Sequence, residues 1–156
     1  MPYDARHIAN GFIRRAAERG RVLSIMQLLK LVYIAHGWNL ALYGQPLIKN
    51  RIEAWQHGPV IPDVYSAFRG QGIDVRDPVA VSDQDIDPQT NNILDQIFDI
   101  YGDMSPFKLS DITHVRNGPW YVASQRGGNY AHISDDLIKR HYDEKRRRSV
   151  KGGAIE

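Results

Sequence analysis

The residues best suited to metal binding or general-base catalysis in this chain are six histidines, at positions 7, 36, 57, 114, 132 and 141. Helical zinc sites use spacings such as HxxxH or HExxH, because side chains four residues apart share one helix face. Neither spacing occurs here, and no histidine forms a recognisable motif with a carboxylate. We therefore expect no metal site, and we interpret His36, on an otherwise apolar helix, as a packed and hydrogen-bonded imidazole.

The sequence also lacks the common signatures of nucleophilic and phosphate-binding chemistry. No GxSxG motif is present, and Ser24, Ser105 and Ser134 stand where helix N-caps are expected. The glycines in residues 126–129 are not followed by the Lys-Ser/Thr of a phosphate-binding loop. The aspartates in residues 83–87 lie in a polar loop, without the apolar neighbours that would raise a carboxyl pKa. We expect a protein that is not an enzyme and has no cofactor.

Length and composition indicate a single domain, which we place at residues 1–144. The chain has 156 residues, 42% of them hydrophobic and 24% charged, and domains commonly contain about 100–200 residues. It has no cysteine, which excludes disulfides, thiol catalysis and Cys-based zinc sites. Polar residues interrupt the longest uncharged stretch, residues 31–48, and charged residues interrupt the N-terminal segment. We expect a cytoplasmic protein without a membrane partner.

The net charge of +2 conceals a strong asymmetry along the chain. Residues 139–151 hold seven Lys/Arg and two Asp/Glu, whereas residues 74–111 hold nine aspartates and two basic residues. The basic character therefore belongs to the C-terminal end rather than to the whole domain. We expect residues 145–156 to form a basic, disordered tail.

Two basic regions could contact nucleic-acid phosphates. They are the run at residues 145–148 and the arginines of the first predicted helix, at positions 14, 15, 19 and 21. No aromatic residues alternate with the basic run, and the second predicted helix is too apolar to lie in a DNA groove. We therefore expect no nucleic-acid partner, and a nucleic-acid-binding regulator is the alternative function.

Hydrophobic periodicity and capping residues predict a mainly helical (α+β) fold: a single compact bundle of about six helices with a small β-hairpin. Ser24 and Gln27 form a capping box for a helix that is apolar nearly all round, so that helix belongs in the middle of the domain. Gly37 inside it indicates an element packed closely there. Gly118-Pro119 is expected to stop the chain before Trp120. The predicted helices cover about residues 4–19, 24–43, 62–70, 87–102, 105–114 and 134–145.

The region between the second and third predicted helices changes character. Residues 47–55, around Lys49-Asn50, predict a short hairpin. Residues 57–59 read His-Gly-Pro and are expected to break the strand, because proline cannot donate to a β-ladder. Residues 71–86 are loop-like, with one extended piece expected at 78–81.

Two segments combine aromatic residues with a Gly-Pro pair: residues 53–60, followed by Tyr65, and residues 113–120. The large rings could fill the core, or turns could hold them at the surface as rigid anchors for a partner, and both interpretations fit the pattern. Under the second, the candidate contact residues are Trp55, His57, Pro59, Tyr65, His114 and Trp120. Arg146 and Arg147 of the basic tail are further candidates, for contact with an acidic surface.

Four segments resemble the motifs of a known family. Residues 28–38 read LLKLVYIAHGW, and residues 43–47 read YGQPL; together they are similar to the opening motif of the Panacea domain. Residues 53–60 and 113–120 resemble its later motifs. The resemblance extends over about residues 5–142. The family includes phage-associated proteins of the GepA type and SocA-like antitoxins.

The resemblance implies an antitoxin of a bacterial toxin–antitoxin system that neutralises its cognate toxin, encoded nearby, by direct protein–protein contact. Some family members present the toxin to the ClpXP protease as proteolytic adaptors, so ClpXP is a second expected partner. The resemblance also implies a mainly helical fold with a small sheet and supplies no catalytic residues. Many relatives carry an N-terminal DNA-binding region, which does not fit before Asp4, so operator binding by this chain is not expected.

Overall fold

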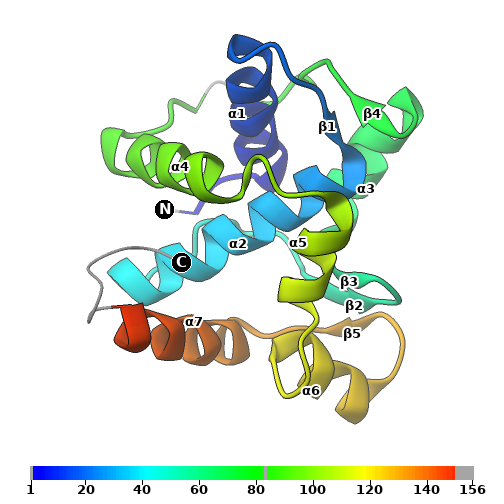
Figure 1. Cartoon of the computed structure of the whole chain (residues 1–156), viewed down its shortest axis with the longest axis vertical. Coiled ribbons are helices and arrows are strands. Elements are labelled where there is room, and N and C mark those ends of the chain that lie inside the picture. The colour runs from blue at the N-terminus through cyan, green and yellow to red at the C-terminus, as the bar shows by residue number, and fades with distance from the viewer. Residues whose placement is uncertain (1, 83, 150–156) are drawn as a thin grey trace.

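The computed structural model describes residues 2–82 and 84–149 of the chain. As predicted, this part is mainly helical, with a few short strands (Figure 1). Its α-helices are α1 (Ala5–Glu18), α2 (Ile25–Tyr43), α3 (Pro62–Phe68), α4 (Pro88–Tyr101), α5 (Pro106–Thr113), α6 (Pro119–Gly127) and α7 (Asp135–Ser149). A 3-10 turn, η1 (Arg69–Gln71), follows α3. The strands are β1 (Leu23–Ser24), β2 (Glu53–Trp55), β3 (Gly58–Val60), β4 (Asp74–Val75) and β5 (Ala131–His132).

Helix α2 is the central element, as its apolar sequence predicts. It packs against α1, α4, α5 and α7 and is buried without interruption from Leu28 to Ala41 (Figure 1). The predicted capping box starts the helix: the Ser24 hydroxyl accepts from the Gln27 amide at 3.0 Å, and the Ser24 amide donates to the Gln27 side chain at 2.8 Å. Gly44, with φ of 67°, ends it in the left-handed conformation.

Helix α7 lies closely against α2 at Gly37, which confirms the close packing predicted there. A Cβ atom at Gly37 would overlap the ring of Tyr142. The preceding residue, His36, is 1% exposed, and its Nδ1 accepts from the amides of Leu47 and Ile48, both at 3.2 Å. Its Nε2 donates to Asp135 Oδ1 at 2.8 Å, and this hydrogen bond lowers the pKa of Asp135. His36 is therefore the packed imidazole that the sequence predicts.

The β-hairpin lies later in the chain than predicted. Strands β2 and β3 pair with Trp55 opposite Gly58, whereas a hairpin within residues 47–55 is not formed. The prediction that residues 57–59 break the strand is correct for His57, which lies in the turn after β2, and wrong for Gly58 and Pro59, which form the edge strand β3 in the order β3-β2-β5. An edge strand tolerates a proline, and Gly58 adopts φ of 121°, which a side chain would disfavour.

Three further differences concern two strands that form through distant contacts and one additional helix. Strand β5 pairs with β2, and strand β4 pairs with β1. The extended piece expected at residues 78–81 forms no strand. Gly118-Pro119 does not interrupt the secondary structure before Trp120. Instead, Pro119 occupies the first turn of α6, where its missing N–H removes no helical hydrogen bond.

The C-terminal helix continues past the boundary predicted at residue 145. Helix α7 ends at Ser149, so disorder is the wrong prediction for residues 145–149; residues 150–156 lie outside the described residues. One side-chain pair joins the extension to the preceding turn, Arg147 with Glu144 at 3.7 Å. Basic residues also interact favourably with a helix C-terminus. In the described part of the chain, no helix is long and apolar enough to cross a bilayer.

Candidate functional site

The two aromatic Gly-Pro segments meet at the β2–β3 hairpin, which lies between α5 and α6 (Figure 1). The Trp120 indole N–H of α6 donates to the backbone oxygen of Trp55 at 2.6 Å. The His114 ring lies edge-on to Trp120, with centroids 5.1 Å apart. On the other side, the Ser110 hydroxyl of α5 donates to the backbone oxygen of His57 at 2.6 Å. Side chains of α5 and of the second segment therefore fix the backbone of the first segment.

A buried lysine holds the inner side of the hairpin. Lys30 of α2 is 1% exposed, and its amine donates to the backbone oxygen of Pro59 at 2.8 Å. A Cβ atom at Gly58 would lie 2.8 Å from that amine, so only glycine allows this approach. Burial disfavours the charged amine and lowers the pKa of Lys30 to about 7. Pro59 is thus a buried scaffold residue whose carbonyl ties the hairpin to the central helix.

The outer side of the hairpin carries three aromatic rings, Trp55, Tyr65 and Tyr130, which we call the aromatic face. Trp55 is half-buried, and the rings of Tyr65 and Tyr130 contact it edge-on, with centroids at 5.2 and 5.5 Å. The Trp55 indole N–H donates to Glu53 Oε1 at 3.0 Å, and Arg51 Nε donates to Glu53 Oε2 at 2.9 Å. These bonds fix the Trp55 ring while part of it stays open to solvent.

Tyr130, which the sequence reasoning missed, is the most exposed ring of the aromatic face. It is 61% exposed and has φ of 64°, a conformation that costs a residue with a Cβ roughly 1–2 kcal/mol. Its amide donates to the Ala54 oxygen at 2.8 Å, which anchors it beside β2. Strained backbone that surrounding structure enforces is concentrated at functional sites. The one available signal was the tight Gly127-Gly128 turn just before it.

The structure separates the candidate contact residues into three groups. Trp55 and Tyr65 belong to the aromatic face, and His57 is exposed at the hairpin turn beside it. Pro59, His114 and Trp120 hold the hairpin from within or behind. The third group, Arg146 and Arg147, lies near the C-terminal end of α7, well away from the hairpin (Figure 1). Among the described residues, no group of three or more His, Cys, Asp or Glu could hold a metal ion.

Residues 28–121 match the family model described as Antitoxin SocA-like, Panacea domain. The chain belongs to this family. It is also similar to Antitoxin SocA of Caulobacter vibrioides (strain NA1000 / CB15N), with 33% identity across 87% of this chain and 80% of that protein. No solved structure matches the chain. The matched range of this Panacea-domain protein contains both Gly-Pro segments, whereas Tyr130 and α7 follow it.

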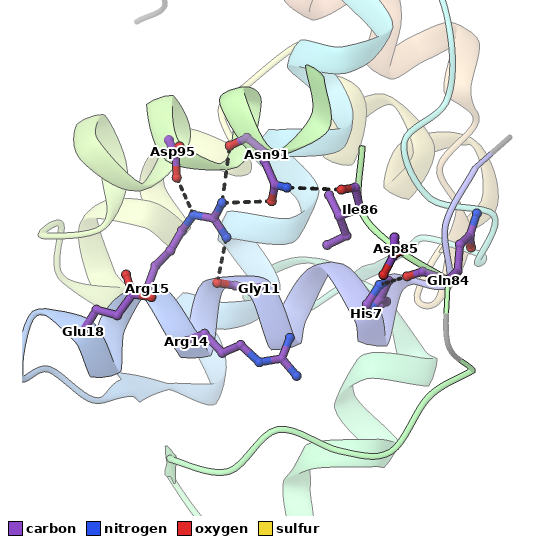
Figure 2. A pocket seen from close by; sticks show the side chains of 10 residues that line it. All are labelled: His7, Gly11, Arg14, Arg15, Glu18, Gln84, Asp85, Ile86, Asn91 and Asp95. Atoms are coloured by element: carbon purple, nitrogen blue, oxygen red, sulfur yellow. Dashed lines mark hydrogen bonds and ion pairs between the residues drawn. The ribbon is translucent and has the colours of Figure 1, made fainter. Parts of the chain in front are cut away.

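A concavity of about 690 Å³ between α1 and the segment leading into α4 is filled at one end by paired charges (Figure 2). The Arg15 guanidinium bonds to Asp95 at 2.8 Å, to the Gly11 oxygen at 3.0 Å and to Asn91 at 3.3 Å. Two more ion pairs continue the row: Arg19 with Asp99, and Arg21 with Asp103. Of the four arginines that could contact phosphates under the alternative function, Arg15, Arg19 and Arg21 are thus opposed by carboxylates.

Proposed function

We propose that this Panacea-domain protein is an antitoxin that neutralises a nearby-encoded toxin by binding it, without catalysing a reaction. The chain's membership of a family described as Antitoxin SocA-like supports the proposal, as does its 33% identity to Antitoxin SocA. The site geometry agrees with a binding role, because Trp55, Tyr65 and Tyr130 form a partly exposed aromatic surface rather than a set of reactive groups facing one cavity.

The aromatic face is the proposed toxin contact, and the observation that carries this is Tyr130. An exposed tyrosine in a left-handed conformation does not improve the fold of the free chain. Tyrosine and tryptophan supply much of the free energy at protein interfaces, because rigid rings bury large areas with little loss of side-chain entropy. Trp55, Tyr65 and the neighbouring His57 complete the surface, and Trp120 and His114 position it.

The first test co-expresses this protein with the product of the adjacent open reading frame. The wild type and the variant Tyr130→Asn are compared for toxin binding and growth rescue. Asparagine tolerates the left-handed conformation, so we expect unfolding stability within about 1 kcal/mol of the wild type. Loss of the ring should weaken toxin binding at least about tenfold and abolish growth rescue. Tyr43→Asn is the matched control, because Tyr43 is 44% exposed at the far end of α2. Equal binding by both variants would remove the aromatic face from the proposal.

The same experiment distinguishes occlusion of the toxin from delivery to a protease. A stable complex that co-elutes through a tag on either protein supports occlusion. Growth rescue without a stable complex, lost in a host that lacks ClpXP, supports the adaptor mechanism found in some relatives. A harmless neighbour that does not bind this chain contradicts the antitoxin proposal.

A further inference from the structure

A second surface, between α6 and α7, has the properties of a binding groove and lies outside the aromatic face. It encloses about 360 Å³ and is bounded by two helices that are adjacent at one edge of the molecule (Figure 1). Pro119, Val122 and Leu137 supply an apolar floor, and Arg126 and Arg140 stand at its rim. We call this the α6–α7 groove.

The groove is distinguished by basic side chains without acidic partners. Arg126 and Arg140 are exposed, and neither forms an ion pair with a described residue. Glu144, the acidic residue at the rim, is already 3.7 Å from Arg147. The exposed guanidinium groups are therefore available for a partner's carboxylates, which they can bind in bidentate geometry.

His141 also lines the groove, and its pKa reflects burial together with basic residues that follow it on α7. The pKa of His141 falls to about 4, because burial disfavours the imidazolium and because Lys145 and Arg148 repel it. The imidazole is consequently neutral at physiological pH, so the charged residues that line the groove are Arg126, Arg140 and Glu144. Positive charge around an apolar floor is complementary to a segment that carries both acidic and apolar side chains.

We propose that the α6–α7 groove binds an acidic segment of the toxin, whose carboxylates contact Arg126 and Arg140 while an apolar side chain covers the floor. This inference rests on the proposed antitoxin function and adds a second contact to it. A polypeptide fits better than nucleic acid, because the groove lining contains no Trp, Tyr or Phe for base stacking. Charged contacts of this kind mainly accelerate association and select the partner.

The test compares two double variants of the full chain that remove the same charge. Arg126→Gln/Arg140→Gln changes the groove, and Arg69→Gln/Arg76→Gln changes two exposed arginines near η1 and β4. The probes are a fluorescent peptide of alternating Glu and Leu and a DNA oligonucleotide of equal charge, each titrated by anisotropy at low and high salt. We expect the peptide to bind the wild type and the control, and its affinity for the groove variant to fall about tenfold at low salt.

If the two variants bind the peptide equally, the groove is not the peptide site. If the wild type binds DNA more tightly than the peptide and the groove variant loses DNA binding, the proposal is also overturned. These probes do not require the toxin, so their outcome is separate from that of the antitoxin proposal. With the toxin, the groove variant should associate about tenfold more slowly at 50 mM salt and within about twofold of wild type at 0.5 M. If the groove variant associates with the toxin as fast as the wild type at both salt concentrations, the groove does not bind the toxin, and the proposal is overturned.

Discussion

Two arginine-rich regions of this protein have opposite electrostatic settings. Three arginines in or just after α1 each face an aspartate in or just after α4: Arg15 with Asp95, Arg19 with Asp99 and Arg21 with Asp103. At the other edge of the molecule, Arg126 and Arg140 face solvent without acidic partners among the described residues. The comparison shows that the fold opposes one group of arginines with carboxylates and leaves the other exposed, which the count of charges does not reveal.

A third setting, the buried Lys30, extends the comparison to a basic group inside the core, and the largest predicted effect concerns it. Its folded-state pKa of about 7 lies below the ordinary value of 10.5, so between these values the unfolded chain binds more protons than the folded chain. Stability therefore rises with pH across this window. We expect a gain of about 3 kcal/mol between pH 7 and 9.5, measured by urea unfolding at each pH.

Lys30→Met is the control for that measurement, because it keeps the length of the side chain and removes the titrating amine. The variant should lose the rise in stability between pH 7 and 9.5, whatever its stability at one pH. A slope that persists in Lys30→Met would assign the proton release to other groups. A wild-type slope of zero would mean that the hairpin opens and hydrates the amine.

The next prediction concerns a variant in which the arginines in or just after α1 lose their acidic partners and become unpaired, like Arg126 and Arg140. Asp95→Asn/Asp99→Asn/Asp103→Asn removes the carboxylates opposite the α1 arginines, and at less than about 1 kcal/mol per exposed pair the fold should persist. The released arginines should raise the salt concentration at which the protein elutes from heparin. The control, Asp74→Asn/Asp77→Asn/Asp111→Asn, removes the same charge at exposed positions outside the row. Equal elution of the two variants would show that the pairs do not neutralise α1.

The sequence predicts those parts of the molecule that depend on neighbouring residues. The caps of α1, α2, α4 and α5 are local hydrogen bonds, such as that from the Thr90 amide to Asp87 at 2.7 Å, and each helix begins where its cap residue indicates. The close approach at Gly37 was also predictable, because a glycine inside an apolar helix costs about 1 kcal/mol relative to alanine and is typical of a position where a second element packs closely.

Contacts between distant residues explain what the sequence did not reveal. Strand β5, more than 70 residues after β3, pairs with the other side of β2, so β3 lies at the sheet edge. At the edge, β3 can contain Pro59. The ion pairs of the α1 arginines join residues about 80 positions apart. The conformation of Tyr130 depends on its bond to Ala54. The candidate residues therefore included Trp55 and Tyr65 but lacked Tyr130, Arg126 and Arg140, whose roles arise from tertiary structure.

The smallest predicted effect concerns a surface ion pair on α7, the helix that borders the groove. Asp143→Asn breaks the pair with Lys139, which contributes about 0.3–0.5 kcal/mol on an exposed helix. It also removes a negative charge from the C-terminal half of the helix, where the helix dipole disfavours anions, and this gain offsets part of the loss. We expect the thermal midpoint to move by less than about 3 °C and helical circular dichroism to be unchanged, because Tyr142 anchors α7 on α2. A measurable loss of helix in Asp143→Asn would show instead that surface charges hold residues 143–149 in place, and the groove would then differ from the α1–α4 row in rigidity as well as in charge.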